Sequence, residues 1–425
     1  MILVALAACA VSNPTLWPDD DVPMLVFASW GGTTSARTRV EVDDEAGPVL
    51  TTDWQDAGGD HRVPLLGLAP DHEFTARVVS EAGESSDDVD FATGTVPAEL
   101  PGWSVSGTPG WEGYLLTGIV SEPSWAVVLD QDGRVVWAKK AHDGKRVLRV
   151  RVRPDGEGLR YSEIEEAELT ETSQLVTVDW DGTEVSRHTV PAFNHDFVDA
   201  DDGGADCLVT DVRPGQSGAE VIGDAIHHVS DDGAITPLWS TWDAWEVPPD
   251  DEIEGGRQWT HANALDRRDG GGYWLGLRNS SELVELDADL AVGRRIGGPE
   301  STYTFATQAD RPKWQHQFQF LDGGVILFDD RDEDPSRVLE LTLDETTATA
   351  TAAWTWTHPK NLEVYILGDV DRAADGSTLA VFSTSGVIDD IAPDGELRWE
   401  LSLDLGSIVP YVVRLDALPG VSRGR

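Results

Sequence analysis

The stretch Asp130-Gln-Asp-Gly-Arg-Val-Val-Trp137 decides the fold, because an acidic turn that contains glycine leads directly into a short apolar strand ending in tryptophan. Asp-Gly turns of this kind join antiparallel strands. The same pattern returns along the chain at intervals of roughly 40 to 60 residues, and this spacing is typical of the blades of a β-propeller. Further copies lie at residues 180–182, 231–239 and 393–399, with less regular ones at 287–295 and 344–356.

This repeat predicts an all-β fold, namely a six-bladed β-propeller preceded by a small β-sandwich domain. Residues 14–98 alternate short apolar and polar runs between Gly, Asp and Pro, as the strands of an antiparallel sandwich do. Within them, the segment Leu66-Gly-Leu-Ala-Pro-Asp-His-Glu-Phe74 is similar to a corner of fibronectin type III domains. We expect residues 99–110 to be a linker and residues 111–425 to form the propeller, with the strand at 407–415 closing the ring beside the first blade.

The charge of the chain excludes some classes of partner. It carries 77 acidic residues against 31 basic ones, for a formal net charge of −46. A protein this acidic repels phosphate backbones and anionic lipid surfaces, so we expect no nucleic-acid partner. Beyond the N-terminus, no apolar stretch reaches the roughly 18 residues that a membrane span requires.

The N-terminus indicates export. Residues 1–13 begin with an apolar run, and Leu6-Ala-Ala-Cys9 resembles the lipobox of bacterial lipoprotein signal peptides. Cys9 would then be lipidated, and the protein would be a periplasmic or cell-surface lipoprotein, or secreted. Membrane contact is expected only through this N-terminal anchor. The alternative is a frayed apolar end with an incidental cysteine.

Three histidines open segments that align with one another. Each histidine precedes a short strand, an acidic glycine-rich turn and a second strand that ends near an arginine. The segments are His195-Asp-Phe-Val-Asp-Ala-Asp-Asp-Gly-Gly204, His261-Ala-Asn-Ala-Leu-Asp-Arg-Arg-Asp-Gly270 and His316-Gln-Phe-Gln-Phe-Leu-Asp-Gly-Gly324. Because the first strand of each blade lines the central channel, residues in equivalent register converge around the axis. We therefore expect the three histidines to meet at one mouth of the channel, although a single histidine in a strand is more often structural.

The residues near these histidines indicate which kind of site they form. Three imidazoles could bind zinc with an open fourth position, act as nucleophile and acid/base, or bind an anion. Strand alternation places Asn263 on the same face as His261, and Arg278 ends the paired strand of that segment. A guanidinium beside the imidazoles opposes zinc and favours an oxyanion. Trp259 and Trp314 flank the segments, and we expect them to line an aromatic pocket.

The ordered set of short motifs resembles the bacterial aryl-sulfate sulfotransferases, which move a sulfuryl group between phenols without a nucleotide donor. The motifs are Asn194-His195-Asp196, His261-Ala262-Asn263, Arg278 and Gln315-His316-Gln317, and the resemblance covers most of the chain.

The resemblance implies that His316 is the nucleophile and forms a sulfohistidine intermediate. It also implies that His261, Asn263 and Arg278 hold the sulfuryl oxygens and that His195 gives acid/base help. The implied partners are a phenolic sulfate donor and a phenolic acceptor, used in a ping-pong sequence without a cofactor.

Two other functions fit the same residues. A propeller that binds a ligand or a protein without catalysing a reaction could retain the histidines. A metal-dependent hydrolase or lactonase is a further alternative. The acidic loop at 329–334 could hold calcium, but it lacks the spacing of an EF-hand and is more typical of a solvated loop.

Overall fold

The structure is a computed structural model that describes residues 11–32, 35–165, 171–249, 253, 257–331 and 334–424. Strands dominate these residues, and the helical turns among them are short: α1 (Thr241–Ala244), η2 (Gln308–Asp310) and η3 (Ser383–Ser385). The prediction of an all-β fold is confirmed. No described helix has the length and apolar character needed to cross a membrane. Cys9, the predicted lipidation site, lies outside the described residues.

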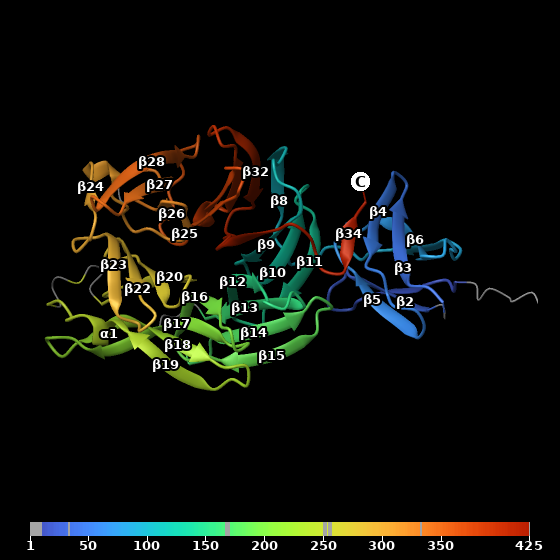
Figure 1. Ribbon diagram of the computed structural model, residues 1–425, viewed down its shortest axis with the longest axis horizontal. Helices are drawn as coiled ribbons and strands as arrows, with labels where there is room; N and C mark the ends of the chain where they lie inside the picture. Colours follow the sequence, from blue (N-terminus) through green and yellow to red (C-terminus); the bar gives the residue numbers. More distant parts are fainter. Residues whose placement is uncertain are drawn as a thin grey trace, which may run out of the picture.

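The larger part of the chain is a ring of mainly antiparallel sheets, the blades of a β-propeller (Figure 1). In the described part of the chain, six sheets make up this ring. The first two sheets contain β33 (Val412–Leu415), β9 (Tyr114–Ile119), β10 (Trp125–Asp130) and β11 (Val135–Lys140), then β12 (Arg146–Val152), β13 (Gly158–Ile164), β14 (Gln174–Asp179) and β15 (Glu184–Thr189). The next two contain β16 (Phe193–Asp199), β17 (Ala205–Pro214), β18 (Glu220–Val229) and β19 (Ile235–Ser240), then β20 (Ala262–Arg267), β21 (Tyr273–Leu277), β22 (Glu282–Leu286) and β23 (Val292–Gly297). The last two contain β25 (Phe318–Leu321), β26 (Gly324–Asp329), β27 (Arg337–Asp344), β28 (Thr349–Thr357) and β24 (Thr304–Phe305), then β29 (Asp369–Arg372), β30 (Thr378–Phe382), β31 (Val387–Ile391), β32 (Leu397–Leu403) and β8 (Trp103–Gly107).

The Asp-Gly turn at residues 130–133 joins β10 to β11. Oδ1 of Asp130 accepts hydrogen bonds from the backbone N–H groups of Asp132 (3.0 Å) and Arg134 (2.9 Å). Gly133 takes the left-handed backbone conformation that the turn requires, with a φ of 74°. The local sequence therefore forms the hairpin without help from distant residues.

Tryptophan at the end of this hairpin packs between two blades. Trp137 on β11 is fully buried, and its ring meets that of Trp180 edge-on at a centroid distance of 6.2 Å. Its indole N–H donates to the backbone carbonyl of Trp180 (3.1 Å). The buried ring of Trp137 and the hydrogen bond of its indole N–H therefore both stabilise the contact between the first and second sheets.

The two ends of the propeller sequence close the ring. β33 pairs with β9, so a C-terminal strand completes the first sheet beside residues 114–119, as the sequence predicted. At the other side, β8 pairs with β32 and becomes the outer strand of the last sheet. The expected linker at residues 99–110 therefore contains a propeller strand and needs correction, because the free edge of β32 offers backbone partners that the linker composition did not reveal.

The N-terminal part forms two further sheets around a shared core. One contains β1 (Thr15–Pro18), β2 (Val26–Gly31) and β5 (Asp60–Leu65), and the other contains β34 (Val421–Arg423), β4 (Gly47–Thr52), β3 (Thr38–Asp44), β6 (Glu73–Ser80) and β7 (Val89–Ala92). β34 comes from the C-terminal end of the chain, so the propeller expected at 111–425 contributes a strand to the sandwich, which corrects that boundary. The relation of this sandwich to fibronectin type III domains stays a prediction.

The sandwich and the propeller share buried contacts. One continuous apolar cluster joins sandwich residues such as Val26 and Leu66 to propeller residues such as Leu116 and Val128. Arg423 on β34 donates from Nε to the hydroxyl of Tyr114 on β9 (2.9 Å). The sandwich is thus packed against the first blade.

Candidate active site

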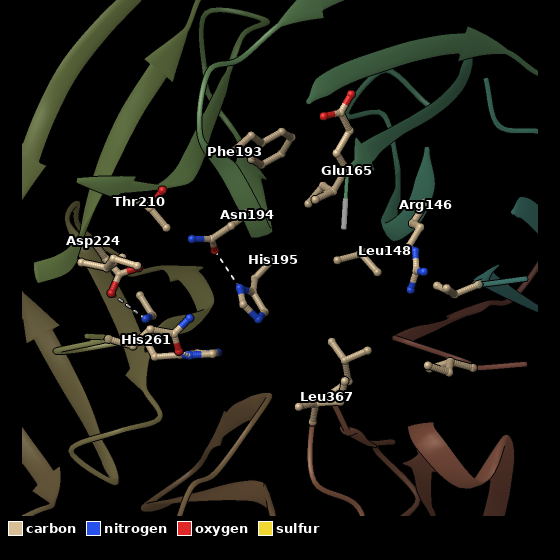
Figure 2. Close-up of a pocket in the computed structure, with 17 residues that line it drawn as sticks. Arg146, Leu148, Glu165, Phe193, Asn194, His195, Thr210, Asp224, His261 and Leu367 are labelled. Atoms are coloured by element: carbon tan, nitrogen blue, oxygen red, sulfur yellow. Dashed lines mark hydrogen bonds between the residues drawn. The ribbon is translucent and has the colours of Figure 1, made fainter. Parts of the chain in front are cut away.

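A cavity of about 340 Å³ opens where the innermost strands of several blades begin. Its wall comes from β12, β16, β17 and β18, and from the segments that precede β20 and β29. Much of the wall is apolar; the apolar side chains include Leu148, Ile164, Phe193, Ile222, Leu367 and Ile408. Figure 2 shows His195 and His261 turned toward the same space. An apolar cavity with a few polar groups is the usual form of a small-molecule site.

His195 and His261 form one half of the site. Their rings lie 5.0 Å apart between centroids, with an interplanar angle of 59°. Both residues have left-handed backbone conformations, with φ values of 47° and 51°. Such conformations are uncommon for residues other than glycine and are often found at functional sites. The shared register of the two segments therefore extends to the backbone itself.

Side-chain amides fix the tautomers of these two histidines. Nδ1 of His195 donates to Oδ1 of Asn194 (2.7 Å), and Nδ1 of His261 donates to Oε1 of Gln258. An amide oxygen only accepts hydrogen bonds, so each neutral ring carries its proton on Nδ1. The Nε2 atoms of both rings are left with lone pairs.

Asp224 on β18 accepts hydrogen bonds from both histidine segments. Its Oδ2 accepts hydrogen bonds from the hydroxyl of Thr260 (2.6 Å) and the backbone N–H of Ala262 (2.8 Å). The Asn194 side chain also donates to this carboxylate, and burial raises the pKa of Asp224 to about 6. One buried carboxylate thus connects the residue before His195 with the residue after His261.

His316 lies beneath the cavity wall, in the segment before β25. Its exposed fraction is 1%, and its Nε2 accepts a hydrogen bond from the backbone N–H of Leu367 (2.8 Å). Its Nδ1 lies 2.8 Å from Oδ2 of Asp330. Leu367 lines the cavity whereas His316 does not, so the proposed nucleophile is covered in this conformation.

Besides burial, the positive charge of Arg278 lowers the pKa of all three site histidines. Arg278 follows β21, donates from Nη2 to the backbone carbonyl of Tyr365 (3.0 Å), and its guanidinium lies 5.1 Å from the ring centroid of Trp314. Burial, together with the charges of His316 and Arg278, lowers the pKa of His195 to about 3. Burial and the Arg278 charge also hold the pKa values of His261 and His316 well below their usual range.

None of the three other predicted substrate-binding residues lines the cavity; Asn263, Trp259 and Trp314 contact neighbouring protein groups instead. Asn263 is fully buried and donates from Nδ2 to the backbone carbonyl of Gln315 (2.8 Å). The pairing of β20 shifts register between Ala262 and Ala264, so the strand alternation used to place Asn263 beside His261 breaks there. Trp259 meets Trp242 edge-on at 5.2 Å, and Trp314 stands against Arg278.

A family comparison decides the identity of the chain. The family model described as Arylsulfotransferase (ASST) matches residues 114–402, which is more than half of the sequence. This chain belongs to the arylsulfotransferase family. The matched region includes His195, His261, Arg278 and His316. As a sulfotransferase, this protein uses a donor and an acceptor of the sulfuryl group.

Comparisons with individual proteins add little to the family assignment. No curated protein sequence matches the chain. Among solved structures, it is similar to a protein of unknown function from Bacteroides caccae (13% identity, 71% of this chain and 98% of the other, TM-score 0.43). It is also similar to virginiamycin B lyase from Staphylococcus aureus (10% identity, 74% and 100% coverage, TM-score 0.37). Both TM-scores lie below 0.5, so these likenesses carry no conclusion about this arylsulfotransferase.

This arylsulfotransferase also has a buried ionic cluster near the axis of the ring that was not predicted from the sequence. Asp196 is fully buried, with Oδ1 at 3.2 Å from Nε of Arg149 and 3.1 Å from Nη2 of Arg151. The alternating arginines in the innermost strand β12 were a signal for it, since side chains two positions apart share one face of a strand. The segment that brings Leu367 to His316 had no comparable signal.

A separate group of potential metal ligands lies on another blade. His358, Asp389 and Glu400 place one ligand atom each within 4.8 Å of one another, and the site histidines form no such group among the described residues. Nδ1 of His358 accepts the backbone N–H of Lys360 (3.0 Å), so the proton of the neutral ring is on Nε2, which lies 3.1 Å from Glu400. A metal needs that Nε2 unprotonated, so the contacts favour a hydrogen-bonded cluster.

The site histidines are expected to stay neutral between about pH 8 and pH 5. Because burial places each folded-state pKa below the ordinary value, protonation requires acidification past that lowered value. The check is the pH dependence of the histidine Hε1 chemical shifts by NMR, with single His→Ala variants for assignment. A midpoint near the usual pKa of about 6.5 for any of the three would contradict the burial argument.

Proposed function

We propose that this arylsulfotransferase moves a sulfuryl group from a phenolic sulfate ester to an acceptor phenol through a sulfohistidine on His316. The observation that carries the proposal is the state of His316. Its Nε2 accepts the backbone N–H of Leu367, so it is the unprotonated nitrogen of the ring and becomes a nucleophile once that N–H moves away. Arg278 lies beside it as the fixed positive charge, and the apolar wall of the cavity offers a surface for an aromatic ring.

The two steps balance without a cofactor. In the first, Nε2 of His316 bonds to the sulfur of the donor, the bond from sulfur to the phenolic oxygen breaks, and the phenolate leaves. In the second, the oxygen of the acceptor phenol bonds to sulfur while the bond from sulfur to Nε2 breaks. The acceptor phenol loses its proton to solvent, and the unprotonated Nε2 atoms of His195 and His261 can accept a hydrogen bond from its hydroxyl group.

The tautomers of His195 and His261 change the roles that the family resemblance implied for these residues. Because the rings of His195 and His261 present lone pairs, they do not donate hydrogen bonds to sulfuryl oxygens while neutral. Arg278 supplies positive charge for the sulfuryl oxygens, as fixed cations do in phosphoryl transfer. His195 and His261 then accept hydrogen bonds from the acceptor hydroxyl, and Asn263 supports the neighbouring segment through Gln315.

Purified protein is expected to release 4-nitrophenolate from 4-nitrophenyl sulfate in a burst of about one equivalent per protein, followed by turnover that depends on added phenol. Initial rates at several phenol concentrations should give the parallel double-reciprocal lines of a ping-pong reaction. Rapid-mix absorbance measurements check the burst, and folded protein without substrate turnover on several aryl sulfates would contradict the proposal.

A binding propeller without chemistry is the second candidate. The contact between Leu367 and His316 favours it, since Nε2 is covered in this conformation. Calorimetric binding of an aryl sulfate without release of phenol would assign this function instead. Export and lipidation at Cys9 remain a separate proposal, because that residue lies outside the described ranges.

A further inference from the structure

Asp330 is a buried acidic residue whose side chain lies against His316. It follows the last residue of β26, and its side chain is 1% exposed. Its Oδ2 lies 2.8 Å from Nδ1 of His316 without the geometry of a hydrogen bond, and neither carboxyl oxygen has a hydrogen-bond partner. Burial raises the pKa of Asp330 well above its ordinary value. Burying a carboxylate is costly unless it has a partner, so this placement needs an explanation.

The adjacent acidic residue, Asp329, has hydrogen-bond partners at both of its carboxylate oxygens. Oδ1 of Asp329 accepts the backbone N–H of Lys313 (2.7 Å), and Oδ2 accepts from Nε of Arg337 (2.8 Å). Asp334, further along the same loop, is 63% exposed at its side chain and pairs with Arg331. Of these three described acids, Asp330 is the one that faces the histidine.

The hydrogen bond on the other side of the ring determines where the proton of His316 lies. Because Leu367 donates its N–H to Nε2, that nitrogen carries a lone pair, and the neutral ring has its proton on Nδ1. The Nδ1 proton lies on the side of the ring that faces the Asp330 carboxylate. A carboxylate on Nδ1 is a common way of fixing a histidine tautomer.

We propose that Asp330 is a positioning residue for His316: it holds the tautomer that leaves Nε2 nucleophilic and balances the positive charge that forms on the ring when Nε2 bonds to sulfur. The charge argument is general, since an imidazole that forms a bond through Nε2 while keeping its Nδ1 proton becomes cationic. This proposal rests on the proposed sulfuryl transfer for its catalytic part, whereas its tautomer part stands on the structure alone.

The first test is the tautomer in the unmodified protein. Long-range ¹H–¹⁵N NMR of the ¹⁵N-histidine-labelled full chain distinguishes a proton on Nδ1 from one on Nε2, and the His316→Ala variant assigns the signals. We expect His316 to be protonated on Nδ1. An Nε2-protonated His316 would overturn the proposal whether or not the protein transfers sulfuryl groups.

The second test compares Asp330→Asn with Asp334→Asn, a matched control in the same loop. Asp330→Asn should slow the burst of 4-nitrophenolate by roughly 10²–10⁴-fold, as loss of an orienting carboxylate does in the catalytic triad. The dissociation constant for 4-nitrophenyl sulfate should change less than about threefold, because Asp330 does not line the cavity. Asp334→Asn should behave as the unmodified protein, and circular dichroism confirms that both variants fold.

The outcomes separate the two proposals. If the unmodified protein shows no burst but loses the Nδ1–H tautomer in Asp330→Asn, the proposed function fails and the positioning role stands. If the tautomer survives in Asp330→Asn, or if the burst rate is unchanged, Asp330 does not position His316.

Discussion

Replacing His316 by alanine is expected to lower the rate of sulfuryl transfer by roughly 10⁴–10⁶-fold, as loss of a nucleophile does in other enzymes that form covalent intermediates. The backbone N–H of Leu367 determines the tautomer of His316 through its hydrogen bond to Nε2, and Oδ2 of Asp330 lies 2.8 Å from Nδ1. Neither remaining site histidine has an equivalent carboxylate on its Nδ1, since His195 and His261 contact amides there.

The measurement is the single-turnover burst together with intact-mass detection of a sulfuryl adduct. The unmodified protein should gain the mass of one SO₃ group after mixing with 4-nitrophenyl sulfate, and His316→Ala should not. His227→Ala is a matched control, because His227 is a half-buried histidine on β18 that does not line the cavity. An adduct that persists in His316→Ala would move the nucleophile to another residue, with His195 and His261 the next to test.

Replacing Asp196 by alanine is expected to lower the free energy of unfolding by about 3–5 kcal/mol, the usual cost of leaving buried charges without their partner. Its Oδ1 meets Arg149 and Arg151 from β12, and its Oδ2 accepts from Nε2 of Gln317 (2.9 Å) and from the backbone N–H of Leu265 (3.2 Å). One side chain thus connects the sheets of β12, β16 and β20 and the segment before β25 at the centre of the ring.

The pH dependence of this contribution has a definite sign. Burial acts to raise the pKa of Asp196, but Arg149 and Arg151 outweigh it and the pKa is lowered. Because the folded-state pKa lies below the unfolded value, the stabilisation is complete above about pH 4 and is lost as the pH falls toward the lowered pKa.

Urea unfolding at neutral pH measures the effect of Asp196→Ala, and its difference from the unmodified protein should shrink on acidification. Asp201→Asn serves as the control, because its side chain is 94% exposed and its partner Arg267 lies at the surface. That change should stay within about 0.5 kcal/mol. Equal stability of Asp196→Ala and the unmodified protein would show that the buried arginines find other partners.

Local sequence alone determined the blades and the register of the histidines. The turn at Asp130 forms from hydrogen bonds within four residues, so its pattern could be read wherever it recurred. Strands that alternate around such turns have few other ways to pair, and equivalent positions on their innermost members converge. The meeting of His195 and His261 follows from that regularity.

Tertiary structure alone decided the state of His316 and the boundaries of the domains. Leu367 reaches His316 from 51 residues away, and a register shift in β20 removes Asn263 from the face that alternation gave it. β8 and β34 join sheets whose other strands lie far from them in sequence. These features depend on which backbone groups and side chains remain unpaired after the blades have formed, and a pattern of short range carries no information about partners at that distance.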